Sequence, residues 1–256
     1  MTEATQFTRT KMSRVGGTAV LTLASDKVNA LDSEVLGEIT SFVDLCEQDD
    51  GIGALVLTGE GPVFSAGLNV SEVLDNDKDQ TGVLLDALTT ALTRLFRCPK
   101  PTVAAINGSA IAGGCILACA FDKRLIAEGA RIGVTELRVG VSFPTVAAEL
   151  LLHACGADAE PLMLDAGLLD ADEACRRGLV HESWPLPDLL PAAMAAAEQA
   201  ASLDGTAYAL AKASSRRRAL RAMDEDEGRR IDQRVRDQWQ DDRTRESLDR
   251  IRKPKG

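Results

Sequence analysis

The sequence predicts an α/β protein whose core of alternating strands and helices continues into a helical C-terminal region. Strand-type and helix-type apolar patterns alternate through the first half of the chain, which is typical of βαβ units on a largely parallel sheet. Strand patterns fade from about Pro144 onward. Because no fixed-period repeat or Ser/Gly-rich linker separates the halves, we expect one α/β core over residues 1–190 and a helical region over residues 191–256.

The first elements follow from their own apolar patterns. Residues 18–24 (TAVLTLA) alternate apolar and small polar side chains, as strands do, and residues 52–58 (IGALVLT) form a short apolar run typical of a strand buried on both faces. Between them, residues 33–48 have apolar side chains at helical spacing, with Asp32 or Ser33 placed as the N-cap. We therefore expect a helix to connect two buried strands.

The next elements are separated by turn-forming residues. A Gly- and Pro-rich stretch over residues 59–67 ends the second strand, and Pro99 and Pro101 stop a later helix. The expected elements are helices over residues 70–75 and 81–96, a strand over residues 102–106, a turn at residues 107–108 and a helix over residues 113–120.

The second half contains only helical patterns. The expected helices cover residues 147–155, 159–166, 171–177, 189–202, 206–222 and 225–251. The last of these carries dense charges of both signs and sparse apolar residues at near-heptad spacing. Its pattern fits a solvated helix and equally fits a helix that packs on a neighbouring subunit.

Composition and charge exclude several classes of protein. The 256 residues are 45% hydrophobic and 27% charged, as in globular proteins, and no apolar run is long enough to span a membrane. The net charge of -10 argues against nucleic acids and anionic membranes as partners. Six scattered cysteines and two distant histidines favour neither a disulfide framework nor a metal site. Because residues 1–14 also contain no apolar signal segment, we expect a soluble cytoplasmic protein.

Two small-residue turns that follow apolar strands are the first candidates for a ligand site. They cover residues 64–69 (FSAGLN) and residues 107–114 (NGSAIAGG). Small residues let backbone N–H groups approach a ligand, and a helix beginning at Gly113 adds its positive dipole end. Two such turns at the carboxyl ends of parallel strands can form an oxyanion hole, although each turn alone is also typical of tight packing. Neither turn matches the Walker A or the GxGxxG pattern.

Four ordered blocks resemble the crotonase (enoyl-CoA hydratase/isomerase) superfamily. They are residues 27–31 (KVNAL), 63–67 (VFSAG), 100–108 (KPTVAAING) and 112–115 (AGGC). The resemblance extends over about residues 17–171 and implies a crotonase-like spiral of ββα turns with a helical C-terminal trimerisation region. It also implies an acyl-CoA thioester as substrate, no separate cofactor, and assembly as a homotrimer or homohexamer.

The resemblance implies roles for individual residues. The backbone N–H groups of Ala66 and Gly113 are expected to hold the thioester oxygen, while Val28, Ala30 and Leu68 line the CoA channel. These positions fall in the two small-residue turns and in the first block, so both lines of reasoning indicate one oxyanion hole. Loss of one donor from such a hole typically weakens transition-state stabilisation by about 2.7–4 kcal/mol.

The acids of the sequence discriminate between reactions. Hydratases of this family carry a glutamate just after the second glycine turn and another about one strand and turn later. Here Ile116 occupies the first position and Glu136 the second, while Thr135 replaces a frequent proline and Asn69 a frequent aspartate. Addition of water is served most easily by two carboxylates, whereas a double-bond shift needs only one proton carrier. Glu136 and the substrate-facing Ile116 therefore favour isomerisation.

We accordingly expect an enoyl-CoA isomerase that moves the double bond of a 3-enoyl-CoA to the 2-position through a dienolate. One alternative is a hydratase that recruits Glu72 or Asp75 as a second acid, although both also fit an exposed helix face. Another alternative is a catalytically silent family member that only binds acyl-CoA. For Glu136 itself, the structural alternative is a solvated loop glutamate.

Other reactive side chains have structural interpretations. We expect Asp122 to form internal pairs, His153 to pack within its helix, and Cys115 and Cys119 to be small core residues. The arginine run at residues 216–218 fits a solvated helix face and equally fits contact with CoA phosphates.

Overall fold

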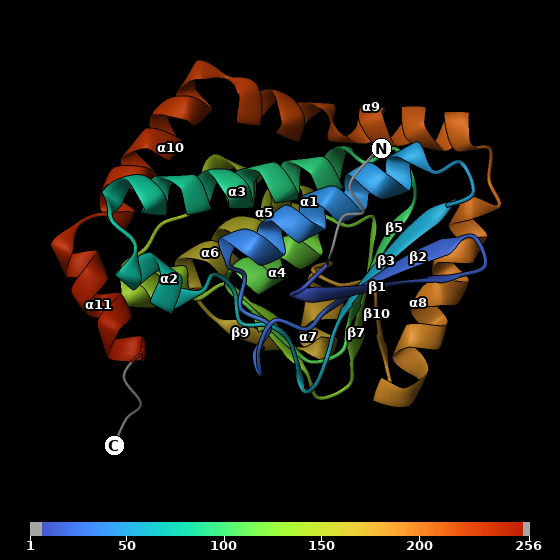
Figure 1. Ribbon diagram of the computed structural model, residues 1–256, viewed down its shortest axis with the longest axis horizontal. Coiled ribbons are helices and arrows are strands. Elements are labelled where there is room, and N and C mark those ends of the chain that lie inside the picture. The colour runs from blue at the N-terminus through green and yellow to red at the C-terminus, as the bar shows by residue number, and fades with distance from the viewer. Residues whose placement is uncertain (1–6, 253–256) are drawn as a thin grey trace.

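The computed structural model describes residues 7–252, and residues 1–6 and 253–256 of the two predicted regions lie outside the described residues. Strands and helices alternate in the first half, and helices dominate the second half (Figure 1). The strands are β1 (Thr10–Val15), β2 (Thr18–Leu23), β3 (Ala54–Gly59), β4 (Val63–Ser65), β5 (Thr102–Ile106), β6 (Ser109–Ile111), β7 (Lys123–Ala127), β8 (Arg131–Gly133), β9 (Leu168–Asp170) and β10 (Glu182–Trp184).

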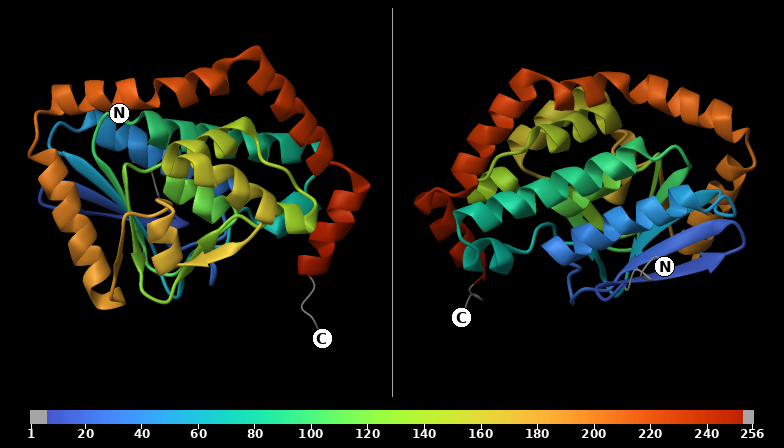
Figure 2. Two further views of the ribbon diagram at one scale, coloured as in Figure 1. Left: turned by 180° about the vertical axis from the view of Figure 1, so that it is seen from behind. Right: turned by 45° about the horizontal axis from the view of Figure 1, so that its top comes forward.

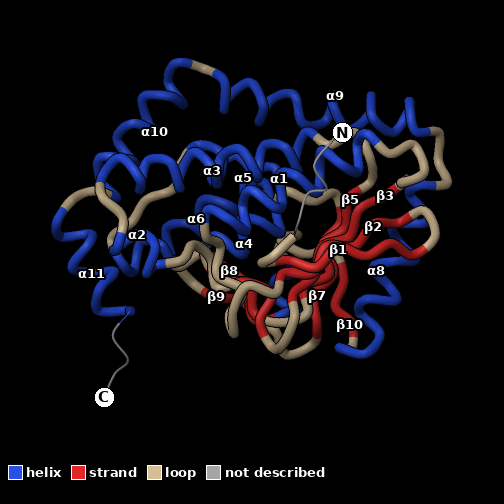
Figure 3. Tube along the Cα trace, in the orientation of Figure 1, coloured by secondary structure: helices blue, strands red, loops and turns tan. Residues whose placement is uncertain are grey.

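Most of the helices lie on one side of the strands, and α8 lies on the other (Figure 3). The helices are α1 (Ser33–Gln48), α2 (Val70–Asp75), α3 (Lys78–Arg97), α4 (Gly113–Cys119), α5 (Thr145–Cys155), α6 (Ala159–Asp165), α7 (Ala171–Arg176), α8 (Leu186–Ala201), α9 (Gly205–Asp224), α10 (Asp226–Trp239) and α11 (Asp242–Arg252), with 3-10 turns η1 (Glu136–Val139) and η2 (Gly156–Asp158). None of the helices within residues 7–252 combines the length and the apolar character needed to cross a membrane.

Two sheets form the α/β core. The larger has the order β1-β2-β3-β5-β7-β10 and the smaller β4-β6-β8-β9. In the larger sheet only the β1–β2 pair is antiparallel, which confirms the predicted, largely parallel sheet. Each of β3, β5 and β7 is followed by a short strand of the smaller sheet and then by a helix or 3-10 turn. This repeated order is the expected spiral of ββα turns.

The predicted helix over residues 33–48 is confirmed at both ends. Asp32 is its N-cap, and the Asp32 side chain accepts a hydrogen bond from the Val35 N–H over 2.8 Å. Its apolar face is buried as the spacing predicts, through Val35, Leu36, Ile39, Phe42, Val43 and Cys46. This face packs with α3, while α8 contacts β3 and β5 elsewhere on the core.

The C-terminal helices pack on the α/β core of the same chain. Figures 1 and 2 show α9, α10 and α11 in succession along the top and one side of the molecule. Helix α9 contacts α5, α10 contacts α3 and α5, and α11 contacts α2 and η1. The expected boundary between residues 190 and 191 lies inside α8, which itself packs on the sheet.

The expected helix over residues 225–251 is in fact two helices. Helix α10 ends at Trp239, and the Asp241 side chain then accepts a hydrogen bond from the Arg243 N–H at the start of α11. Of the apolar stripe, Val235, Trp239 and Leu248 are buried against the chain itself. The stripe therefore covers this protein's own core at those positions.

A buried ionic cluster attaches α9 to the core. The Asp122 carboxylate binds the Lys212 ammonium at 2.8 Å and the Arg216 guanidinium at 2.6 Å, and it also accepts a hydrogen bond from the Tyr208 hydroxyl. The internal pairing of Asp122 is thus confirmed. Both alternatives for the 216–218 run are wrong for Arg216, which is buried and stacks over the Phe96 ring.

The remaining structural interpretations are confirmed for the cysteines and in part for His153. Cys115 and Cys119 are fully buried in α4. The His153 ring lies edge-on against Phe96 with 5.0 Å between ring centroids but is otherwise exposed on α5, and partial desolvation lowers its pKa. Neither cysteine nor His153 lines the cavity described below.

Candidate active site

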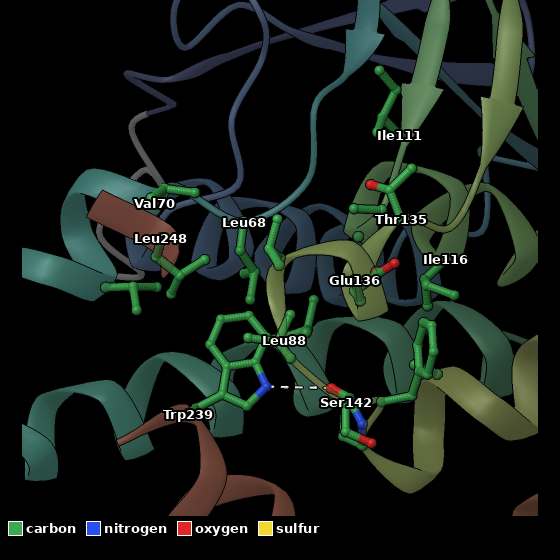
Figure 4. Close-up of a pocket in the computed structure, with 18 of the residues that line it drawn as sticks. Leu68, Val70, Leu88, Ile111, Ile116, Thr135, Glu136, Ser142, Trp239 and Leu248 are labelled. Carbon is green, nitrogen blue, oxygen red and sulfur yellow. Dashed lines mark hydrogen bonds between the residues drawn. The ribbon is translucent and has the colours of Figure 1, made fainter. Parts of the chain in front are cut away.

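A cavity of about 210 Å³ lies between the two small-residue turns and the C-terminal helices (Figure 4). Five of the predicted site residues line it, namely Ala66, Leu68, Gly113, Ile116 and Glu136. The structure does not bring Val28 and Ala30 into the cavity wall. They lie next to the first turn, where the Val28 carbonyl oxygen accepts a hydrogen bond from Ala66 and the neighbouring Leu31 pairs with Leu68.

Glu136 is held in the cavity wall by a short, well-defined turn. It is the first residue of η1, which begins just after β8 and is capped at its C-terminus by Gly140, a glycine with a left-handed φ of 76°. The N–H of Val141 donates to the Glu136 carbonyl oxygen over 3.1 Å and closes the turn. The glutamate is only 9% exposed, so the alternative of a solvated loop glutamate is wrong.

The carboxyl group of Glu136 has the properties of a proton carrier. Burial raises its pKa from 4.5 to about 7, and this outweighs the lowering effect of the N–H groups of Glu136 and Thr135. Its Oε2 atom is buried and has no hydrogen-bond partner among the described residues. A carboxyl group with a near-neutral pKa and a free oxygen can both accept and return a proton at physiological pH.

The first turn presents a different N–H group from the one expected. The Ala66 N–H donates to the Val28 carbonyl oxygen over 3.0 Å, and the Gly67 N–H donates to the Ser65 hydroxyl over 3.2 Å. Within the described part of the chain, the Leu68 N–H has no acceptor, and neither has the Gly113 N–H. The Ala66 N–H, expected as an oxyanion donor, is therefore already bound to Val28. Leu68, expected as a channel residue, offers the N–H instead.

The two turns lie in direct contact. A Cβ atom built on Gly67 would lie 2.8 Å from the Gly113 nitrogen, and one built on Gly113 would lie 3.4 Å from the Leu68 nitrogen. Gly67 also has a φ of 90°, which L side chains rarely adopt. Glycine at position 67 thus allows the Leu68 and Gly113 N–H groups to lie beside the same small space, as an oxyanion hole requires.

The cavity contains no second acid among the described residues. Ile116 from α4 lines the wall near Glu136, as Figure 4 shows. Glu72 lies outside the wall and accepts hydrogen bonds from the Ser33 N–H and hydroxyl, and Asp75 pairs with Arg252 at 2.8 Å. Among the described residues that line the cavity, Glu136 is the single ionisable side chain.

The family model for enoyl-CoA hydratase/isomerase matches residues 14–255. The chain belongs to this family. The similarity to the crotonase superfamily that four short blocks indicated thus extends through the helices that close the cavity.

The relatives and solved structures that this family member resembles are named after both reactions, hydration and isomerisation. The probable enoyl-CoA hydratase echA8 of Mycobacterium tuberculosis is 35% identical over 190 residues, which cover 72% of each chain. The putative enoyl-CoA hydratase of Thermus thermophilus is 36% identical over 191 residues, which cover 73% of this chain and 75% of the relative. Among solved structures, the human mitochondrial delta3-delta2-enoyl-CoA isomerase superposes with a TM-score of 0.91 at 26% identity, covering 97% of this chain and all of that chain.

Sequence reasoning missed the C-terminal part of the cavity wall in this family member. Trp239, Leu248 and Ile251 line the cavity, and Ser142 and Phe143 line it from the loop before α5. The available signal was the apolar stripe of residues 225–251, which contains the three C-terminal residues. That stripe indicates a covered helix face but not which surface covers it.

Proposed function

We propose that this protein is an enoyl-CoA isomerase that converts a 3-enoyl-CoA into the conjugated 2-enoyl-CoA. The observation that carries the proposal is that Glu136, with its pKa of about 7, is the single ionisable group among the described residues of the cavity wall. A double-bond shift moves one proton between two carbons of the same substrate. One carboxylate beside the reacting carbons is sufficient for this transfer.

The proposed reaction uses the two turns and the carboxylate together. The thioester oxygen accepts hydrogen bonds from the Leu68 and Gly113 N–H groups, which have no other acceptor among the described residues. Glu136 removes a proton from C2, and the C2–H electron pair moves into the thioester to give a dienolate. Negative charge then develops on the thioester oxygen, where the two donors stabilise it. The protonated Glu136 returns the proton to C4, which leaves the double bond between C2 and C3.

The surroundings of Glu136 support isomerisation over hydration. Addition of water needs a group that positions and deprotonates a water molecule, and Ile116 can do neither. The acid suggested for that role, Glu72, is bound to Ser33 at the start of α1. The other polar side chains of the wall are Thr135, Ser142 and Trp239, and none of them is a carboxylate.

A parallel assay of a 3-enoyl-CoA and a 2-enoyl-CoA tests the proposal. We expect the protein to form the conjugated product from the first and to hydrate the second slowly or not at all. Glu136→Gln should lower the isomerisation rate by about 10²–10⁴-fold while binding of an acyl-CoA, measured by titration calorimetry, is retained. Ile116→Glu places a second acid beside the cavity and should raise the hydration rate.

Three other outcomes would favour the alternatives. Faster hydration of crotonyl-CoA than isomerisation of any 3-enoyl-CoA would identify a hydratase. Calorimetric binding without turnover of either substrate would identify a silent binder. Full activity of the Glu136→Gln variant would show that another residue transfers the proton.

A further inference from the structure

The far end of the cavity is formed by the C-terminal helices. Trp239 is the last residue of α10, and Leu248 lies in α11. Both line the cavity, and Figure 4 shows them on the side away from Ile116, with Leu88 between the indole ring and Glu136. An acyl chain that has its reacting carbons at Glu136 would therefore extend toward the indole ring of Trp239.

Trp239 is fixed in this position by contacts on several sides. Its side chain is buried, and its Nε1–H donates to the Ser142 carbonyl oxygen over 3.3 Å. The preceding residue, Gln238, accepts a hydrogen bond from the Ser142 N–H and donates one to the Gly140 carbonyl oxygen, each over 2.9 Å. The indole is thus held against the same loop that follows Glu136, and it forms a rigid wall.

The cavity that this wall closes is small. A cavity of about 210 Å³ is below the roughly 300–1,000 Å³ of typical small-molecule pockets. An apolar cavity of about 150 Å³ holds a benzene molecule, so 210 Å³ accommodates roughly eight carbon atoms. The nearby wall residues Val73, Leu88 and Phe143 are apolar, which suits an unsubstituted hydrocarbon chain.

We infer that Trp239 determines the acyl-chain length that this protein accepts, with an upper limit of about eight carbons. The inference rests on the proposed acyl-CoA substrate and adds the residue that sets its size. Chains beyond this limit would have to displace the indole, which is held by Ser142 and by the buried face of α10. Removal of the indole would enlarge the cavity by about the volume of the ring.

Calorimetric titration with saturated butanoyl-, octanoyl- and dodecanoyl-CoA tests the inference without requiring turnover. For the unmodified protein we expect affinity to rise by about fourfold per added methylene group up to octanoyl-CoA, and to fall by about tenfold or more at dodecanoyl-CoA. Trp239→Ala should bind dodecanoyl-CoA at least as tightly as octanoyl-CoA. If Trp239→Ala does not fold, Trp239→Leu should give a smaller shift in the same direction.

Two further variants distinguish an effect of the indole on chain-length preference from a general loss of stability. Trp239→Phe replaces the indole by a smaller ring, so we expect a shift toward longer chains that is smaller than in Trp239→Ala. Val235→Ala weakens a buried contact on the same helix without touching the cavity wall, so it should lower stability and leave the preference unchanged.

Several results would overturn the inference. They are equal affinity of the unmodified protein for dodecanoyl- and octanoyl-CoA, an unchanged preference in Trp239→Ala, and a relaxed preference in Val235→Ala. If none of the three thioesters binds, the proposed acyl-CoA function fails as well. Binding of all three with an unchanged preference in Trp239→Ala contradicts the role of Trp239 alone.

Discussion

The carboxylate of Glu72 accepts a hydrogen bond from the backbone N–H of Ser33 over 3.0 Å and another from the Ser33 hydroxyl. Ser33 is the first residue of α1, where a negative charge stabilises the exposed N–H groups of the helix. This contact holds Glu72 at a helix terminus and away from the cavity that Glu136 lines.

Glu72→Gln should therefore affect stability more than catalysis. We expect a loss of about 0.5–2 kcal/mol in the free energy of unfolding, measured by urea denaturation, because the charged partner of the α1 N-terminus is removed. Turnover of a 3-enoyl-CoA should stay within about twofold of the unmodified protein. Asp75→Asn, which removes a surface partner of Arg252, serves as control. A hundredfold loss of turnover in Glu72→Gln alone would show that Glu72 reaches the substrate.

Gly113→Pro and Gly113→Ala differ in the N–H group that is proposed to hold the oxyanion. Proline is tolerated at the first position of a helix but has no N–H. Both substitutions add a Cβ near Gly67 and Leu68, at 3.3 and 3.4 Å, so they share the crowding at this atom. We expect kcat of the proline variant to be about 10²–10³-fold below that of the alanine variant. Equal kcat values in two folded variants would remove Gly113 from the oxyanion hole.

The raised pKa of Glu136 predicts the pH dependence of the reaction. The glutamate must be ionised to accept the C2 proton, and its pKa is about 7. We therefore expect kcat/KM to fall about tenfold per pH unit below pH 7 and to level off above it. Burial also raises the pKa of Glu149, which does not line the cavity, so Glu149→Gln should retain this profile. A profile that is flat between pH 5 and 8 would contradict the assignment of the base.

The same pKa predicts that the proposed catalytic group destabilises the folded protein at neutral pH and above. The folded-state pKa of about 7 lies above the ordinary value of 4.5, so the folded state binds this proton more strongly than the unfolded state does. The contribution to stability is complete below about pH 4.5 and is lost as the pH rises through 7, by about 3 kcal/mol in total.

Glu136→Gln should accordingly be more stable than the unmodified protein at about pH 8, by up to about 3 kcal/mol. The difference between the two proteins should shrink as the pH falls toward 5. Urea denaturation at both pH values measures it. A difference that does not change with pH would show that the buried carboxyl group is not the cause.

Arg245 attaches the end of α2 to α11. Its guanidinium donates hydrogen bonds to the carbonyl oxygens of Val73, Leu74 and Asn76, at 3.1, 2.5 and 3.2 Å. Val73 lines the cavity, so a change in this contact should alter substrate binding. We expect Arg245→Lys to raise KM for the acyl-CoA with little change in kcat, because a lysine ammonium cannot reproduce the planar set of guanidinium donors. It should also lower the free energy of unfolding by about 1–3 kcal/mol. Arg243→Lys on the same helix is the control, and an unchanged KM for Arg245→Lys would contradict the proposed contact.

The predictability of the elements depended on their length and burial. Helix α1 is recognisable because an N-cap aspartate and a continuous apolar face agree on its bounds. The three-residue strands β4, β6 and β8 are too short to show an alternating pattern, and they exist because they pair with one another. Strand β1 was missed because it is an edge strand with mostly exposed side chains.

The candidate site was predictable in its turns and not in its details. The sequence blocks indicate the two turns and Glu136, but hydrogen bonding to Val28 decides that the Leu68 N–H and not the Ala66 N–H is available. Burial, which raises the pKa of Glu136, depends on side chains that come together only in the folded chain. Trp239 lies about a hundred residues beyond Glu136, and no local pattern connects the two.

The late position of Trp239 and Leu248 in the chain has a consequence for protein synthesis. Ribosomes produce the chain from the N-terminus, and N-terminal parts of a protein can begin to fold before the rest has been made. The two turns and Glu136 therefore leave the ribosome well before α10 and α11. Until those helices dock, the cavity lacks the wall that Trp239 and Leu248 form, so the carboxyl group should be more open to water and its pKa lower than in the complete fold. The nascent chain would thus carry a more acidic Glu136 than the finished protein does.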